Sequence, residues 1–355
     1  MPATSVDTFF ACSLMVLLVL SAMAATSKIL QPFAFNARDE NASERWSALS
    51  EYLLQSGGAP ENWGQNRTAA PSAFGLAKGG SNVPYELDID KVCRLNSENV
   101  YAVTYAQTFT AFGIPDASFK IEVKPFFEVN VNLTATFTSA DETIYEFEIQ
   151  TARHGVAVET ELSCYVIADN HLESGFAYAS EGRAYVNITL SNAVNGPALL
   201  VVLARSVSDS RIASFIGYPF AHNSSQPKNR GAFLRLSPLN YSLDVSFIQQ
   251  GIDLSDAYAL TFHYNSTLEQ VASSNESATY GIPHFLESSP TVVVVTGRNS
   301  TTFFAEWAAY PQVPVQAGAD FSTTASLSNV FGYTYLVSIS SAVYECTVWL
   351  GGPRE

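Results

Sequence analysis

The feature that most constrains the fold of this chain is a change in the spacing of its apolar residues after residue 118. Phe119, Ile121 and Val123 alternate with charged residues, and residues 127–137 continue the alternation with an apolar side chain at every second position. A period of two is typical of a strand with one buried face. Apolar runs of strand length follow, separated by turn residues: 160–167, 184–190, 198–204, 243–247, 259–264, 291–296, 302–307, 333–339 and 343–350. This regular succession predicts antiparallel β-sandwiches.

The residues before this β-rich part have helical signals. Asn41 precedes an apolar spacing of three and four residues, with Glu44 placed as in a capping box, which predicts a helix over 41–55. A short helix is expected at 90–95. Because Gly, Pro, Asn and Ser dominate residues 56–84, that stretch is expected to consist of turns.

The N-terminus carries an apolar segment with no charged residue between Asp7 and Lys28. Twenty residues of helix are about 30 Å long, which is the thickness of a bilayer core. Cleavage after Ala24 at the small-x-small site Ala22-Met23-Ala24 would instead release a secreted chain. The leader MPATSVD lacks the Lys or Arg of an ordinary signal. We therefore expect a single N-terminal anchor with the rest outside the cell, and keep the cleaved signal as the alternative.

Potential N-glycosylation sites are numerous downstream of this segment. Eight Asn-x-Ser/Thr sequons occur: Asn41, Asn66, Asn132, Asn187, Asn223, Asn265, Asn275 and Asn299. A sequon can be used only if it is exported and exposed. Together with the apolar segment, they favour the outer face of the cell membrane as the location.

The composition excludes some functions and leaves others open. The 355 residues carry a net charge of −15 with no basic cluster, so we expect no nucleic-acid partner. Cys12 lies in the apolar segment, while Cys93, Cys164 and Cys346 permit at most one intrachain disulfide. Their spacings match no zinc pattern, so the sequence predicts buried free thiols or one bridge.

Motifs for catalysis or cofactor binding are missing from the sequence. There is no H-E-x-x-H, G-x-S-x-G, Walker or dinucleotide-binding motif, and the five histidines have no metal-ligand spacing. Asp88 with Asp90, and Asp253 with Asp256, do not match a calcium loop, so solvated turn carboxylates are expected. The abundant aromatics of 303–335 are expected in a core, with a binding face as the alternative. We expect no enzyme, no cofactor and no metal.

A resemblance to a known group is carried by four short motifs within residues 51–121. They are GAPENW at 58–63, FGLA at 74–77, LDIDKV at 87–92 and FGIP at 112–115. In this order they resemble exported archaeal surface proteins with a type IV pilin-like N-terminus. The resemblance covers about a third of the chain. It implies an apolar helix, a second helix and turns ahead of a β-rich exterior.

In the same resemblance, Asp7 looks like the acidic residue that pilin-like segments keep near their start. It implies assembly through packed N-terminal helices, with Asp7 neutralised by the amino terminus of a neighbouring subunit. The leader departs from the pilin pattern because it has no basic residue. A second resemblance, over 125–205, is to immunoglobulin-like modules of prokaryotic surface proteins. HGVAV at 154–158 and SEGRAYV at 180–186 carry it.

The expected fold is therefore mainly β, with two immunoglobulin-like antiparallel sandwiches. The expected division is a membrane or signal helix (1–28), an α/β stalk segment (29–118), a first sandwich (119–220) and a second sandwich (221–355). The expected function is that of a membrane-anchored structural or adhesive surface protein, with a pilin-like filament subunit as its most specific form. Its partners would be the membrane, further copies of itself, other surface proteins or glycans. A secreted glycan- or protein-binding module and an extracytoplasmic hydrolase are the alternatives.

Overall fold

The computed structural model describes residues 15–16, 18–21, 23, 43–115, 117–287, 290–300, 302–321 and 330–351. The chain divides into two compact units, residues 1–50 and 51–355. In the first unit, the described residues are helical. Within the described ranges, no helix has both the length and the apolar character needed to cross a membrane. Asp7 and Asn41 lie outside the described residues.

Three helical stretches precede the sheets. Residues 43–55 are helical, which confirms the predicted helix from residue 43 onward. Helix α2 (Ile89–Leu95) matches the short helix that was expected, and the Asp88 side chain caps its first turn. Helix α3 (Tyr105–Phe112) was not predicted, although Thr104 and Gln107 form a capping box at its start.

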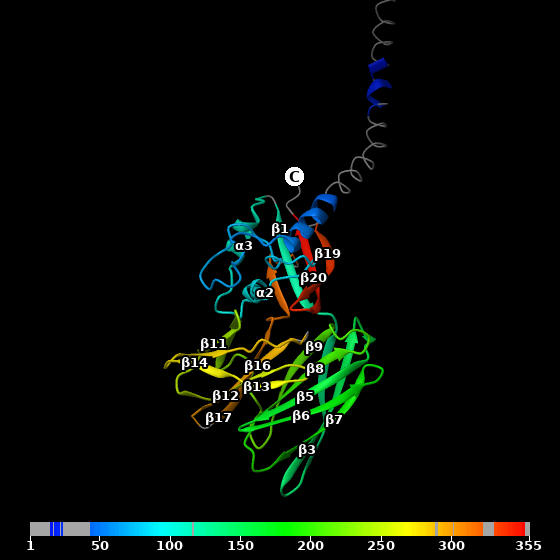
Figure 1. The fold of residues 1–355 in the computed structure, drawn as a ribbon. Coiled ribbons are helices and arrows are strands. Elements are labelled where there is room, and N and C mark those ends of the chain that lie inside the picture. The colour runs from blue at the N-terminus through cyan, green and yellow to red at the C-terminus, as the bar shows by residue number, and fades with distance from the viewer. Residues whose placement is uncertain are drawn as a thin grey trace, which may run out of the picture. The chain divides into compact units, whose positions relative to one another are not determined.

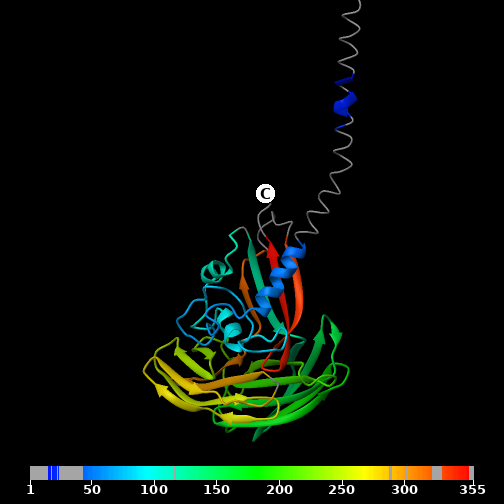
Figure 2. The same ribbon diagram turned by 45° about the horizontal axis from the view of Figure 1, so that its top comes forward.

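A four-stranded antiparallel sheet, here called the head sheet, has the order β18-β1-β20-β19. Its strands are β1 (Ser118–Pro125), β18 (Val315–Gly318), β19 (Phe331–Ile339) and β20 (Ala342–Gly351). In Figures 1 and 2, the red strand β20 lies between β1 and β19. Phe119 of β1 packs against Phe74 and Phe112, with ring centroids 5.2 and 4.9 Å apart. The chain leaves this sheet after Pro125 and re-enters it at Val315, so all other strands are inserted between β1 and β18.

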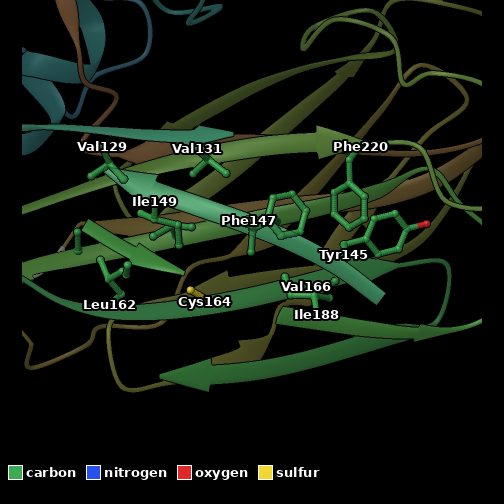
Figure 3. Close-up of a cluster of buried hydrophobic side chains, with 14 of the residues drawn as sticks. Val129, Val131, Tyr145, Phe147, Ile149, Leu162, Cys164, Val166, Ile188 and Phe220 are labelled. Carbon is green, nitrogen blue, oxygen red and sulfur yellow. The ribbon is translucent and has the colours of Figure 1, made fainter. Parts of the chain in front are cut away.

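The first sandwich is formed by two facing sheets from residues 128–220. One sheet contains β2 (Glu128–Thr138), β3 (Glu142–Arg153), β4 (Val156–Ala157) and β7 (Arg183–Ser191). The other has the order β6-β5-β8-β9, with β5 (Thr160–Ala168), β6 (His171–Ala179), β8 (Ala198–Ser206) and β9 (Ala213–Phe220). Figure 3 shows Tyr145, Phe147 and Ile149 of β3 pointing toward Cys164 and Val166 of the facing sheet. This cluster is the core of the first sandwich.

The second sandwich is built the same way from residues 234–310. One sheet has the order β10-β11-β15-β14, with β10 (Leu234–Leu239), β11 (Ser242–Phe247), β14 (Glu269–Ser273) and β15 (Ser277–Gly281). The other has the order β13-β12-β16-β17, with β12 (Ile252–Leu260), β13 (Asn265–Thr267), β16 (Thr291–Asn299) and β17 (Thr302–Tyr310). Its core draws side chains from both sheets and also contains Cys93 of α2. Helix α2 therefore belongs to the packing of the second sandwich as well as to the head.

The two sandwiches share one order of connections. In each sandwich, one sheet contains the first two strands, and the second strand also pairs with a strand from later in the chain (β2-β3-β7 and β10-β11-β15). β4 and β14 are added to these sheets, and four other strands of each sandwich form the facing sheet in corresponding order (β6-β5-β8-β9 and β13-β12-β16-β17). The expected ranges 119–220 and 221–355 separate β1 from β20, whereas these two strands pair directly.

The sandwiches meet through the sheets that contain β5, β8 and β16. These strands are buried on both faces, and such strands read as nearly continuous apolar runs. The Tyr165 hydroxyl donates to the Thr261 carbonyl at 3.0 Å, and Phe215 of β9 packs edge-on against Trp307 of β17. The two sandwiches thus bury an apolar face between them.

The long alternation at 127–137 is only partly realised. Phe127, Val129 and Val131 are buried as expected, but Leu133 and Phe137 are 37% and 57% exposed. The register against β3 shifts between Leu133 and Ala135, and this irregularity reorients the strand beyond that point. The buried face ends at Val131, and the shift accounts for the exposure of Phe137 beyond it.

Candidate binding pocket beside Trp307

A cavity of about 440 Å³ lies between the 223–230 loop, the start of β8 and strand β17. The loop follows the end of β9, so it belongs to the first sandwich at one end and leads into the second at the other. Trp307 is half-buried on the wall of the cavity. The pocket therefore lies where residues of both sandwiches come together.

A buried carboxylate fixes this loop. Glu306 of β17 is only 3% exposed and accepts hydrogen bonds from the backbone N–H groups of Gly231, Ala232 and Phe233, at 2.6, 3.0 and 3.2 Å. Burial raises the pKa of Glu306, while the three N–H donors and Arg230 act in the opposite direction. These bonds hold the end of the loop against β17, so the pocket wall is pre-organised.

Three basic side chains line the same cavity. The Arg230 guanidinium lies 4.6 Å from the centroid of the Trp307 ring and pairs with Glu98 at 2.5 Å. Lys228 Nζ lies 5.4 Å from the Phe233 ring, which stacks on Phe304. The electrons of an aromatic face attract a cation placed over it, so these rings help to hold the Arg230 and Lys228 side chains in position.

The third basic side chain is held from the first sandwich. Arg298 Nη2 contacts both carboxylate oxygens of Asp169 at 2.9 Å. The Asn195 amide also donates to Asp169 at 3.2 Å. Arg298, like Arg230, is therefore held in the wall of the cavity by an ion pair with a carboxylate.

Hydroxyl and amide groups complete the lining. They are contributed by Asn195, Ser224, Ser225, Gln226 and Thr302. Phe303 and Pro219 add apolar surface. The cavity combines cationic, hydrogen-bonding and apolar groups, which suits non-covalent binding of a polar ligand with a negative charge.

The sequons occupy different environments. Asn66, Asn132, Asn187, Asn265 and Asn275 are exposed. Asn132 and Asn187 both pair with residues of β3, namely Glu148 and Glu146, so they lie on the outer face of the same sheet.

Two other sequons have their amide nitrogens engaged. Asn223 is exposed, but its Nδ2 donates to the carbonyls of Asn192 and Val194 at 2.9 and 3.1 Å. Asn299 is half-buried, and its Nδ2 donates to Gln249 at 2.6 Å. Because a glycan is attached at Nδ2, its addition would disturb these bonds at Asn223 and Asn299.

The expectation of solvated turn carboxylates is wrong for Asp90, which is 2% exposed because backbone and hydroxyl donors satisfy its carboxylate. Asp88 caps α2, and the buried Asp90 accepts from the Asn240 N–H at 2.7 Å and the Tyr310 hydroxyl at 3.0 Å. Burial raises the pKa of Asp90. Over the ranges that the structure describes, no group of three or more His, Cys, Asp or Glu side chains is arranged to hold a metal ion.

Two buried cations of α2 hold the turn-rich segment that precedes it. Lys91 is fully buried, and its Nζ donates to the Gly57 and Ala77 carbonyls at 2.8 and 2.7 Å. Arg94 donates to the carbonyls of Trp63 and Asn66. The short motifs around 58–63, 74–77 and 87–92 therefore meet as one packed structure.

Three cysteines and His222 contribute to packing. Cys93, Cys164 and Cys346 are buried and free, so the described cysteines form no disulfide. His222 is 1% exposed, with Nδ1 2.8 Å from the Tyr145 hydroxyl and Nε2 3.1 Å from the Ser191 carbonyl.

The basic residues of the pocket were not predicted from the sequence. Lys228 and Arg230 lie in a polar loop, and only their proximity to each other in a chain with few basic residues could have drawn attention. Glu306 had a clearer signal, since it is a single charge within the apolar run 303–310. Of the aromatics in this region, Phe303, Phe304 and Tyr310 are core residues, while Trp307 reaches the pocket.

No protein family and no curated protein matches the chain. Similar solved structures include the paired C2 domains of Extended-Synaptotagmin 2, at 8% identity over 68% of this chain and 92% of that chain, with a TM-score of 0.13. A longer fragment of the same protein, which adds the SMP domain to the two C2 domains, matches at 11% identity over 71% of this chain and 60% of that chain, with a TM-score of 0.15. Neither likeness carries an argument about fold or function.

Proposed function

We propose that this protein is a membrane-anchored structural or adhesive protein of the outer cell surface. The observation that carries the proposal is the repeated sandwich topology, with two modules of one strand order joined over a buried apolar face. That strand order is the one found in immunoglobulin-like sandwiches. Modules of this kind commonly serve as rigid spacers and adhesive units, and a buried junction stiffens a pair of them.

Two further features support an external location. The uncharged segment from residue 8 to residue 27 is long enough to anchor the chain, and six sequons lie on exposed surface. The most specific form of the proposal is a pilin-like subunit whose N-terminal helices assemble, with Asp7 neutralised between subunits. A secreted glycan-binding module is the second candidate, and the cationic pocket beside Trp307 favours it.

The location is tested by treating intact cells with a protease that cannot enter them, and comparing the chain with a cytoplasmic marker. Selective digestion of this chain is expected, because residues 51–355 would face the medium. Protection equal to that of the marker would contradict the proposal.

Filament assembly is tested separately by shearing. A filament subunit appears in the sheared surface fraction, and Asp7→Asn should abolish its recovery there. Recovery of the Asp7→Asn chain in the sheared fraction at the normal level would contradict the proposal of a pilin-like subunit. The proposal of an anchored, monomeric surface protein would then stand.

A further inference from the structure

We propose that the pocket beside Trp307 binds an anionic saccharide, a sugar chain that carries carboxylate or sulfate groups. This inference goes beyond the proposed surface role by naming a ligand class. It rests on the pocket alone, and it holds whether the chain is anchored or secreted.

The charge of the pocket carries the first step. Lys228, Arg230 and Arg298 line one cavity of a chain that has 33 acidic and only 18 basic residues. Glu306 is the acidic residue in the lining, and its carboxylate is directed to three backbone N–H groups of the loop. Asp169 pairs with Arg298 and Glu98 pairs with Arg230, so the cations that a ligand meets most directly are Lys228 and Arg230, whose partner Glu98 is exposed. An arginine fork binds carboxylate or sulfate with paired hydrogen bonds.

The other lining groups favour a saccharide over a simple anion. Ser224, Ser225 and Gln226 offer hydrogen-bonding groups along one side, and the exposed Pro219 offers an apolar surface. A sugar ring presents hydroxyls at its rim and C–H groups on its faces, so it satisfies both kinds of lining. A volume of about 440 Å³ is within the range of small-molecule sites and exceeds what one inorganic anion would fill.

The pocket is also prepared for binding. Glu306 fixes the loop, and Trp307 supports the Arg230 guanidinium from one side. The Arg230–Glu98 pair has side chains that are 39% and 58% exposed, and exposed pairs contribute little, so a ligand carboxylate can compete with Glu98. Because the loop and the Arg230 side chain are already held in place, binding costs little conformational entropy.

The experiment is calorimetric titration of the full-length chain in detergent, produced in a bacterium without N-glycosylation. The carboxylate probe is trigalacturonate, and its methyl ester is the matched neutral probe. A sulfated galactose trisaccharide, its unsulfated counterpart and inorganic sulfate form the second arm. We expect one or both charged sugars to bind at least about tenfold more tightly than their neutral forms, and more weakly as salt is raised. The two arms tell carboxylate from sulfate recognition.

Three variants locate the site. Arg230→Gln should weaken binding of the charged sugar about tenfold, and Lys228→Gln severalfold. Arg211→Gln removes an exposed arginine of the first sandwich that does not line the pocket, and should leave affinity within about twofold. If Arg230→Gln lowers the melting temperature, the affinity of the Lys228→Gln variant decides the test, because Lys228 is exposed. Equal binding of charged and neutral sugars, full displacement by equimolar inorganic sulfate, or equal losses in Arg211→Gln and Lys228→Gln would overturn the proposal.

Discussion

Gly217 of β9 lies so close to the Trp307 indole of β17 that a Cβ on Gly217 would come within 2.4 Å of the ring. This contact joins the first sandwich to the second, and it exists because position 217 has no side chain. The junction between the two sandwiches therefore depends on Gly217 and Trp307, in addition to the buried faces of β5, β8 and β16.

Gly217→Ala is expected to destabilise the protein by about 1–3 kcal/mol, because overpacking forces the indole or the strand to move. Gly175→Ala is the matched control, since it lies in the same sheet and an added Cβ would meet nothing within 4 Å. It should change stability by no more than about 0.5 kcal/mol. Urea denaturation of both variants measures the difference. Equal stabilities would show that the junction is loose.

Lys91→Ala is expected to cost about 2–4 kcal/mol, because the Gly57 and Ala77 carbonyls lose a buried charged donor. Lys78→Ala serves as the control, because its side chain is 54% exposed and pairs with Glu86 at the surface. That change should cost less than about 1 kcal/mol. Denaturation midpoints give both values, and a small effect at Lys91 would contradict its assigned role in holding residues 57–77.

His222 should make stability fall as the pH drops below about 6.5. Burial lowers the pKa of His222 in the folded state from its ordinary value of 6.5. Between these two pKa values the unfolded chain binds the proton and the folded one does not, so unfolding is favoured there. One such group contributes at most about 1.4 kcal/mol per pH unit. Denaturation at pH 7 and pH 5 should show a smaller fall for His222→Gln than for the unchanged chain, and identical falls would exclude this role.

The thiols of Cys93, Cys164 and Cys346 should resist labelling in the folded protein. Burial raises the pKa of Cys164 and of Cys346 to about 12 and raises that of Cys93 well above its usual value. A Cys12→Ser chain, treated with a thiol reagent without reductant, should react slowly when native and show three thiols in denaturant. A single thiol in denaturant would reveal a disulfide and contradict the free state.

The sequence predicts most of the strands but not how they are combined. The runs that form β5, β8 and β16 are recognisable because strands buried on both faces are continuously apolar. The alternation in β3 around Tyr145 and Phe147 is equally clear, yet the strands predicted from the sequence did not include it. The pairing of β1 with β20 joins residues more than 200 positions apart, and no local pattern encodes a partner at that separation.

The pocket was harder to foresee for a similar reason. Arg230, Arg298 and Glu306 come from a loop and two strands, and only the fold brings them together. The mainly β class followed from periodicity. The core prediction for the aromatics of 303–335 is right for Phe303, Phe304 and Tyr310, whereas Trp307, Phe331, Tyr333 and Tyr335 are half-buried. The role of Glu306 depends on the loop that ends at Phe233, and that of Trp307 depends on β9 of the first sandwich.

The most direct test of the surface role is the N-terminus of the mature protein, determined by mass spectrometry on isolated cell envelopes and on the medium. We predict an envelope-bound chain that retains residues 8–24. A chain that begins at Ala25 and is recovered from the medium would contradict the anchor and the filament assembly, and would leave a secreted binding protein.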